Sequence, residues 1–186
     1  MRRRGRRTVS GKQPEQKGSG MAVRDLLYLG NPKLYEESSK VKHEELEDLK
    51  SVIEDLADTL AEFRDEYGWG RAIAAPQIGV MKRIVYMHVN EPVVLINPVI
   101  KLRNRRKTLV WDDCMSCPDL LVQVKRYRRC KVEYRDVNWQ KRSLYLEGKL
   151  ATLMQHEVEH LQGILITQKA ITEKSFALRS ERAYLK

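Results

Sequence analysis

The hydrophobic pattern predicts two amphipathic helices on either side of a long central stretch. Between residues 46 and 63, apolar residues recur at steps of three and four, charged residues fill the gaps, and Gly68 follows. This spacing is typical of a helix with one buried face that ends at a glycine. A second pattern of the same spacing runs from Leu150 to Leu161, and Gly163 follows it. We expect both helices to bury their apolar faces in the core.

The stretch between these helices predicts strands. Apolar and polar residues alternate, β-branched residues are frequent, and polar turns such as 90–92 and 136–138 interrupt the pattern. The predicted strands are 83–89, 93–102, 107–111, 120–124, 129–135 and 142–146. A helix, then strands with short turns, then a helix indicates an α+β fold. We expect antiparallel β-sheets around the second helix, with a long N-terminal helix and a C-terminal helix or extended segment.

Composition is that of a globular protein of one domain. The chain has 186 residues, of which 42% are hydrophobic and 32% charged. No apolar run reaches the roughly 18 residues of a membrane span, so no membrane partner is expected. The odd number of cysteines, three, favours a reducing compartment over a disulfide framework. No apolar stretch follows the basic N-terminus, so we expect a cytoplasmic protein, with import into an organelle left open.

The net charge of +10 is concentrated at the N-terminus. Residues 1–20 hold seven Lys or Arg, one Glu and almost no apolar residue, which predicts a disordered basic tail before a catalytic domain at 21–186. An RNA-binding arm, a targeting segment and sequence upstream of a start at Met21 are the alternatives. Contact with ribosomal RNA is our hypothesis for the tail and for the basic C-terminal residues, which are Lys174, Arg179, Arg182 and Lys186.

The second predicted helix carries an H-E-x-x-H segment from His156 to His160. Residues four apart share one face of a helix, so the two imidazoles can bind one metal ion. Glu157 lies beside them and is free to move protons. The alternative is a pair of surface histidines next to acidic residues.

Cys114 is the candidate third metal ligand. A thiolate and two imidazoles leave one tetrahedral position for water, as in catalytic zinc sites. A closed structural Cys2His2 site with Cys117 is the competing interpretation, because Cys114 and Cys117 form a C-x-x-C pair. However, 38 residues separate Cys117 from His156, far more than a small zinc finger uses.

A Gly- and Ala-rich segment, residues 68–79, precedes the predicted strands. Small residues permit close approach of another backbone, and Gln77 offers an amide donor for a carbonyl oxygen. A tight turn between helix and sheet explains the glycines but not Gln77. No phosphate-loop motif is present in the segment.

Taken together, residues 70–77, 112–116 and 155–160 resemble the three motifs of the peptide deformylase family, in the same order. The family motifs are Gly-x-Gly-x-Ala-Ala-x-Gln, Glu-Gly-Cys-x-Ser and Gln-His-Glu-x-Asp-His. The resemblance implies a metal-dependent hydrolase that removes the N-formyl group from formyl-methionine on nascent polypeptides, in protein biosynthesis and N-terminal methionine processing. It implies one divalent metal, with Fe²⁺ as the native ion and Zn²⁺, Ni²⁺ or Co²⁺ as alternatives.

The resemblance also implies roles for individual residues. Cys114, His156 and His160 would hold the metal, which makes hydroxide available from bound water near neutral pH. Glu157 would act as general base and then as general acid. The Gln77 side chain and the Met115 backbone N–H would stabilise the oxyanion. The candidate substrate-binding residues are Gly70, Arg71, Ala72, Asp113 and Leu153, of which Leu153 would wall an apolar pocket for the methionine side chain.

The chain departs from the family motifs in several places. Ala72 replaces the second glycine and is expected to narrow the substrate groove. Asp112 and Asp113 replace Glu and Gly before the ligand cysteine, so Asp113 adds a charge near the metal. Glu159 replaces Asp, which lengthens the side chain by one methylene. No implied ligand is lost, but these departures leave the substrate preference open.

Two other functions remain as alternatives. A metalloprotease of the metzincin type requires a third histidine at position 166, which is Ile166, and one of the gluzincin type requires a downstream glutamate such as Glu181. A non-catalytic binding module with a closed zinc site would use Cys117 as fourth ligand.

Overall fold

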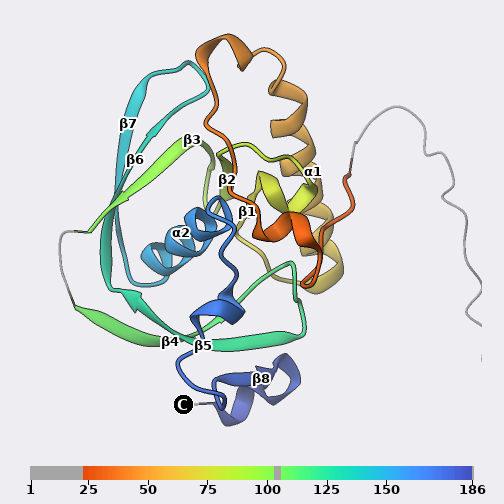
Figure 1. The fold of residues 1–186 in the computed structure, drawn as a ribbon, viewed down its shortest axis with the longest axis vertical. Coiled ribbons are helices and arrows are strands. Elements are labelled where there is room, and N and C mark those ends of the chain that lie inside the picture. Colours follow the sequence, from red (N-terminus) through yellow and green to blue (C-terminus); the bar gives the residue numbers. More distant parts are fainter. Residues whose placement is uncertain (1–22, 103–105, 186) are drawn as a thin grey trace, which may run out of the picture.

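The structure, a computed structural model, describes residues 23–102 and 106–185 (Figure 1). The predicted tail at 1–20 lies outside the described residues. The two α-helices are α1 (Lys50–Tyr67) and α2 (Lys149–His160). The strands are β1 (Ala72–Ala74), β2 (Ile84–His88), β3 (Pro92–Lys101), β4 (Lys107–Asp113), β5 (Leu120–Tyr127), β6 (Arg129–Arg135), β7 (Lys141–Glu147) and β8 (Phe176–Leu178).

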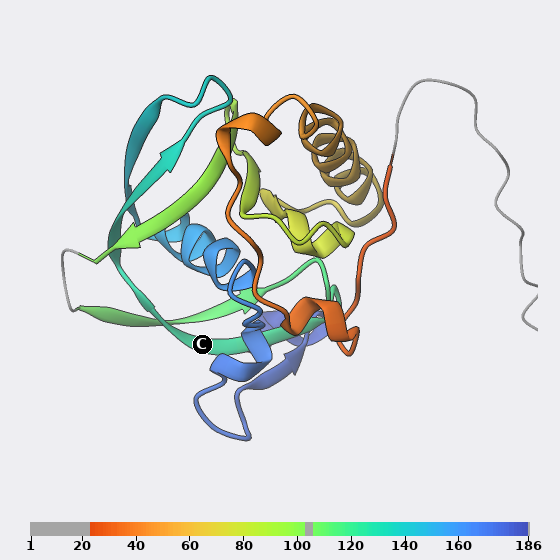
Figure 2. The same cartoon turned by 45° about the horizontal axis from the view of Figure 1, so that its top comes forward.

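The strands form two antiparallel sheets. One has the order β1-β2-β3-β6-β7 and the other has the order β4-β5-β8. Helix α2 contacts strands of both sheets and lies in the space that they enclose (Figures 1 and 2). The prediction of an α+β fold with antiparallel sheets around the H-E-x-x-H helix is therefore confirmed.

Two details of the predicted elements are wrong. The first helix begins at Lys50 and not at residue 46, because His43–Glu45 form a short 3-10 helix and a turn follows. Strand β1 was not predicted, since Ala72–Ala74 has no polar residue to give an alternating pattern and was taken for a turn. At the C-terminus, the predicted helix or extended segment consists of the short strand β8 and the 3-10 helix Arg179–Tyr184.

The hydrophobic core lies on both faces of the five-stranded sheet. On one face, Ala72 and Ala74 pack with the buried side of α2, which includes Met154 and Val158. On the other face, Ile73 packs against α1. The alternating residues of β1 thus join two core layers, and the edge of this short strand lies next to α2.

Two glycines end the helices as predicted. Gly68 follows α1 with φ +74°, and its N–H donates to the Arg64 carbonyl over 2.8 Å. Gly163 follows α2 with φ +69°, and its N–H donates to the His160 carbonyl over 3.1 Å. A Cβ at Gly163 would lie 2.4 Å from the Tyr35 carbonyl oxygen, so only glycine fits this turn.

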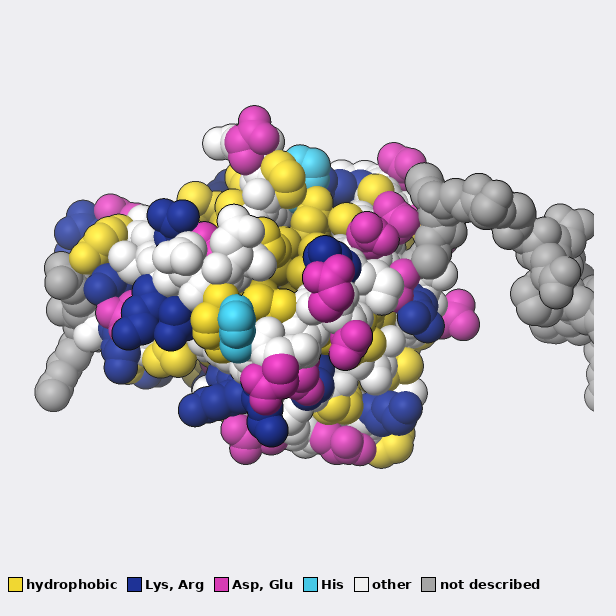
Figure 3. Space-filling view, turned by 90° about the horizontal axis from the view of Figure 1, so that it is seen from above, with side chains coloured by type: hydrophobic (Ala, Val, Ile, Leu, Met, Phe, Trp, Pro, Cys, Tyr) yellow, Lys and Arg dark blue, Asp and Glu magenta, His cyan; other side chains and the backbone are white. Residues whose placement is uncertain are grey.

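Charged side chains of both signs are interspersed on the face seen in Figure 3, around hydrophobic side chains near its middle. Within the described residues, no helix is both long and apolar enough for a membrane span.

Candidate active site

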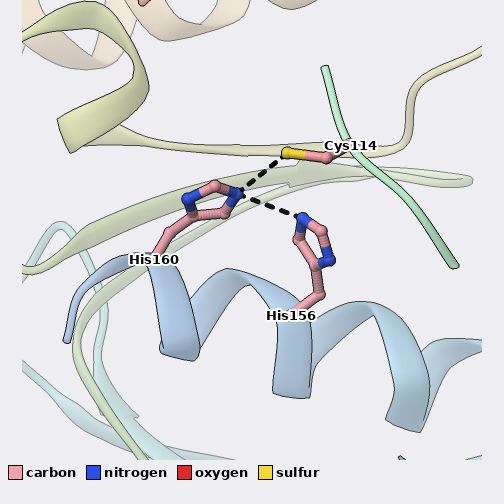
Figure 4. Close-up of side chains that lie close together, drawn as sticks. All are labelled: Cys114, His156 and His160. Carbon is pink, nitrogen blue, oxygen red and sulfur yellow. Dashed lines mark hydrogen bonds between the residues drawn. The ribbon is translucent and has the colours of Figure 1, made fainter. Parts of the chain in front are cut away.

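Helix α2 brings the two predicted histidine ligands together. His156 and His160 are buried and lie one turn apart, with their Nε2 atoms 3.1 Å from each other (Figure 4). Cys114 follows the end of β4, and its Sγ lies 3.2 Å from His160 Nε2. The structure therefore gathers three buried ligand atoms from two distant parts of the chain.

The spacing of these atoms fits a tetrahedral metal ion. With metal–nitrogen and metal–sulfur bonds of about 2.0–2.3 Å, tetrahedral ligand atoms lie about 3.3–3.6 Å apart. The observed separations of 3.1 and 3.2 Å are close to this range, and all three atoms lie within 4.8 Å of one another. The donor set of one sulfur and two nitrogens suits a divalent transition metal and leaves one position open.

Asp112 orients the first histidine. Its Oδ2 lies 3.2 Å from His156 Nδ1, where an Nδ1–H can donate to it while Nε2 faces the other two ligand atoms. Burial lowers the pKa of His156, but Asp112 outweighs it and raises that pKa to about 9, so Nε2 must lose its proton when a metal binds. Burial favours the neutral carboxyl, but His156 and Arg126 outweigh it and lower the pKa of Asp112 to about 2. Asp112 is therefore a carboxylate, and it supports His156 from behind the ligand atoms.

Arg126 links the two acidic residues that depart from the family motifs. Its Nη2 lies 2.8 Å from Asp112 Oδ2 and its Nη1 lies 2.5 Å from Glu159 Oε2. Asp112 is one methylene shorter than the family residue and Glu159 is one methylene longer. A single guanidinium reaches both carboxylates, and Asp112 remains in contact with His156.

Sequence reasoning missed Arg126, although a signal was present. Arg126 is fully buried in β5, on the same face as Val122 and Val124. A charged residue at a buried position of an alternating strand needs a charged partner, which would have directed attention to this residue.

The Gln77 side chain is fixed from both ends. Its Oε1 accepts from the Ala74 N–H over 2.9 Å, and its Nε2 points to Ser116 Oγ at 3.2 Å and to Cys114 Sγ at 3.8 Å. The amide N–H groups therefore face the Cys114 side of the cluster. Met115 lies next to that cysteine and is also buried.

Glu157 is buried on α2 beside the histidines. Its Oε2 atom has no hydrogen-bond partner among the described residues. Burial raises the pKa of Glu157 to about 7, against the opposing effect of His156. A carboxyl with a pKa near neutrality can both accept and donate a proton at physiological pH.

Burial shifts the pKa values of two of the candidate ligands, Cys114 and His160. Burial raises the pKa of the Cys114 thiol well above its usual value and lowers the pKa of His160 well below its own. His160 is therefore neutral, as a metal ligand must be, whereas Cys114 must lose its proton when a metal binds.

A groove of about 740 Å³ opens over the cluster and is bordered by Gly68–Ala72 on one side and by β4 on the other. All five predicted substrate-binding residues line it, together with Gln77, Met115, Cys114, His156 and Glu157. Leu153 forms part of its apolar lining with Val110 and Trp111.

The charge of Asp113 is matched, which sequence reasoning did not foresee. Asp113 Oδ2 lies 3.1 Å from Arg179 Nη2 and 3.6 Å from Arg182 Nη1. The Arg179 guanidinium also covers the ring of Trp69 at 3.7 Å from its centroid. The C-terminal segment thus forms a wall of the groove.

The alternative fourth ligands lie outside the cluster. Within the described residues, only Cys114, His156 and His160 form a metal-binding group. Cys117 is half-buried and does not join them, and Glu181 is exposed and bonds Ser180. Neither residue therefore completes the group as a fourth ligand among the described residues, which argues against the closed zinc site and the gluzincin arrangement.

The chain is similar to known deformylases in sequence and in fold. The model of the polypeptide deformylase family matches residues 23–176. The peptide deformylase of Pelagibacter ubique is 36% identical over 151 residues, which are 78% of this chain and 84% of that protein. The crystal structure of the Thermotoga maritima peptide deformylase has a TM-score of 0.73 and 30% identity, covering 81% of this chain and 99% of that one. The Synechococcus elongatus enzyme, in complex with actinonin, has a TM-score of 0.75 and 27% identity, covering 89% of this chain and 88% of that one.

Proposed function

This chain belongs to the peptide deformylase family, and from that premise we propose how its own residues remove the formyl group. Enzymes of the family hydrolyse the N-formyl group from the methionine of nascent peptides, and the chain is an enzyme of this class. One observation carries the assignment of roles: the buried Cys114-His156-His160 group lies at the groove beside Glu157, which has a carboxylate oxygen without a partner among the described residues.

Cys114, His156 and His160 would hold the divalent metal, which supplies a water of lowered pKa and polarises the formyl oxygen. Glu157 accepts a proton from the attacking water, whose oxygen bonds to the formyl carbon. Negative charge then develops on the formyl oxygen, and the Gln77 amide and the Met115 backbone N–H donate to it. The C–N bond breaks, Glu157 returns the proton to the amine, and formate leaves.

The groove accounts for substrate positioning. Leu153 borders an apolar region for the methionine side chain, while Gly70, Arg71, Ala72 and Asp113 border the path of the peptide. We assign Fe²⁺ as the native ion, with Zn²⁺, Ni²⁺ or Co²⁺ as substitutes, because thiolate and imidazole bind all four.

We further assign residues 21–186 to one catalytic domain, and the cytoplasm as its location. The basic tail and C-terminal segment would bring the enzyme to ribosomal RNA. Co-sedimentation with ribosomes should then weaken steeply as salt increases. No binding at low salt, or binding that is insensitive to salt, would contradict this interaction.

The central experiment measures formate released from a formyl-methionyl peptide by protein loaded anaerobically with Fe²⁺ or with Ni²⁺. Wild-type protein should turn the peptide over, and Glu157→Ala should lose activity by at least about a hundredfold, the usual size of a general acid–base contribution. Metal analysis of both proteins serves as the control, since Glu157 is not a ligand. A folded, loaded wild-type protein without turnover would overturn the proposal.

A second measurement tests the ligand set. Cys114→Ser should lose most of the bound metal, whereas Cys117→Ser should keep it, because Cys117 lies outside the cluster. Equal metal loss in both variants would contradict the three-ligand site.

A further inference from the structure

The groove carries more positive than negative charge that is available to a substrate. The cationic residues that line it are Arg71, Lys149, Arg179 and Arg182. Its anionic residues are Asp112, Asp113 and Glu157. Two of these anions are already matched, Asp112 by Arg126 and Asp113 by Arg179.

Arg179 is committed to the protein itself. Besides its ion pair with Asp113, its Nε donates to the Pro118 carbonyl over 2.7 Å and its guanidinium covers Trp69. By contrast, the side chains of Arg71 and Lys149 form no ion pair or hydrogen bond with any residue that the structure describes.

Of these two, Arg71 is the stronger candidate for a recognition residue. Lys149 is exposed, whereas Arg71 is half-buried. Arg71 lines the groove and has no ion pair or hydrogen bond among the described residues, so its guanidinium is available to an anion that enters the groove. Arg71 is also close enough to the reacting centre to lower the pKa of Glu157, against the larger effect of burial.

The backbone next to Arg71 is arranged to hold an extended peptide. The Arg71 carbonyl accepts from the His88 N–H over 2.8 Å, so the polar groups of Arg71 face β2. In an antiparallel pair, successive residues point their backbone N–H and C=O groups to opposite sides of the strand. The N–H and C=O of Ala72 therefore face the open edge of the sheet. A peptide strand that pairs there extends from the metal group past Arg71.

We propose that the groove selects formyl-methionyl peptides with a carboxylate side chain on one of the two residues that follow the methionine, and that Arg71 is the residue that recognises it. This specificity rests on the proposed function. The partner is a carboxylate because the planar guanidinium can bind both of its oxygens. Asp113 does not repel it, because Arg179 and Arg182 offset that charge.

The test compares kcat/KM for peptide amides of the forms formyl-Met-X-Ala and formyl-Met-Ala-X, with Asp, Asn or Lys at X. Asn has the shape of Asp without its charge, so the Asp-to-Asn ratio isolates the carboxylate. We expect this ratio to be at least about ten in one of the two series, mainly through KM, as for one charge-assisted contact. Lysine should be the poorest substrate, and added salt should reduce the ratio.

Variants of Arg71 test whether this residue causes the preference for Asp over Asn. Arg71→Leu should bring the Asp-to-Asn ratio close to one, and Arg71→Glu should make Lys better than Asp. Arg71→Lys should restore part of the preference. Arg142→Leu, which removes one positive charge at an exposed pair with Asp136 outside the groove, is the matched control and should keep the wild-type ratio. Calorimetric binding of the same peptides to metal-loaded Glu157→Gln protein gives the ratio without turnover.

The outcomes separate this specificity from the function on which it rests. Wild-type turnover with equal rates for Asp and Asn would overturn the specificity and leave the deformylase activity intact. A preference that survives in Arg71→Leu would overturn the role of Arg71. A preference seen only with free peptide acids, and not with amides, would mean that the C-terminal carboxylate is the recognised group. No turnover of any formyl peptide would instead count against the proposed function.

Discussion

Among the individual residues, Glu157 combines a cost to stability with the proton-transfer role that we propose for it. Its side chain is buried, one oxygen has no partner among the described residues, and burial raises its pKa to about 7. Such a group is expected where function has been favoured over stability.

Because its pKa is raised in the folded state, Glu157 makes the free energy of unfolding of the metal-free protein depend on pH. The pKa of Glu157 rises from 4.5 when unfolded to about 7 when folded, so between these values the folded protein holds a proton that the unfolded chain has released. The free energy of unfolding therefore falls as pH rises through this window, by up to about 3 kcal/mol from this residue. Glu157→Gln should lack that decrease, as urea unfolding of both metal-free proteins at pH 5 and pH 8 would measure. The same pH dependence in both proteins would contradict the assignment.

Arg126 is the residue on which the buried charge network depends. Arg126→Met would leave Asp112 with His156 alone and Glu159 with Lys169 alone, the latter at 3.5 Å. We expect a loss of about 3–5 kcal/mol in the free energy of unfolding, as for other broken buried pairs. Metal affinity should also fall by about 10–100-fold, because Asp112 loses the guanidinium that holds it against His156.

The control for this prediction is Arg142→Met, which breaks an exposed pair with Asp136. Exposed pairs contribute at most about 1 kcal/mol, so its stability should change little. Chemical unfolding and metal titration compare the two variants. Equal losses in both would show that the buried network is unimportant.

At the scale of the element, α2 depends on the turn that ends it. The turn places Gly163 against the Tyr35 carbonyl, which ties the end of the H-E-x-x-H helix to the N-terminal segment. The Ser38 N–H also donates to the Leu161 carbonyl over 3.0 Å. The position of His160 is therefore fixed by packing as well as by the helix itself.

Gly163→Ala should consequently destabilise the protein more than Gly68→Ala. Both glycines have φ near +70°, so both variants incur the left-handed cost of about 1–2 kcal/mol. Only Gly163 adds a clash, since a Cβ at Gly68 meets nothing within 4 Å. Thermal unfolding should show the larger decrease in Tm for Gly163→Ala. Equal decreases would mean that the turn can shift away from Tyr35 without cost.

At the scale of the whole molecule, the metal site lies on a core that does not depend on it. The two large hydrophobic clusters contain neither His156 nor His160, and they pack both faces of the five-stranded sheet. This differs from a small zinc finger, in which metal binding supplies most of the folding free energy.

Removal of the metal should therefore lower stability without unfolding the protein. We expect chelated protein to keep its far-ultraviolet circular dichroism and to unfold at a lower Tm, since metal binds the folded state preferentially. Addition of Ni²⁺ should restore the Tm. Loss of secondary structure on chelation at 25 °C would show that the core alone is insufficient.

The local features of this protein could be predicted from the order of its residues. The periodicity of apolar residues predicted α1, α2 and six strands, because side chains repeat on one face about every 3.6 residues in a helix and every two residues in a strand. The i, i+4 spacing placed His156 and His160 on one face for the same reason. The three motifs in register identified the family, which the comparisons confirm.

Contacts between residues that are distant in the sequence could be identified only from the tertiary structure. Three contacts join residues that are far apart in the sequence. Cys114 lies beside His160, Arg126 pairs with both Asp112 and Glu159, and Asp113 pairs with Arg179. The pairing of β3 with β6 and the edge position of β1 are of the same kind. Such contacts depend on how sheets and helices pack, and packing is not encoded in any short segment. For this reason the sequence predicted a charge at Asp113, and only the fold revealed that Arg179 and Arg182 balance that charge.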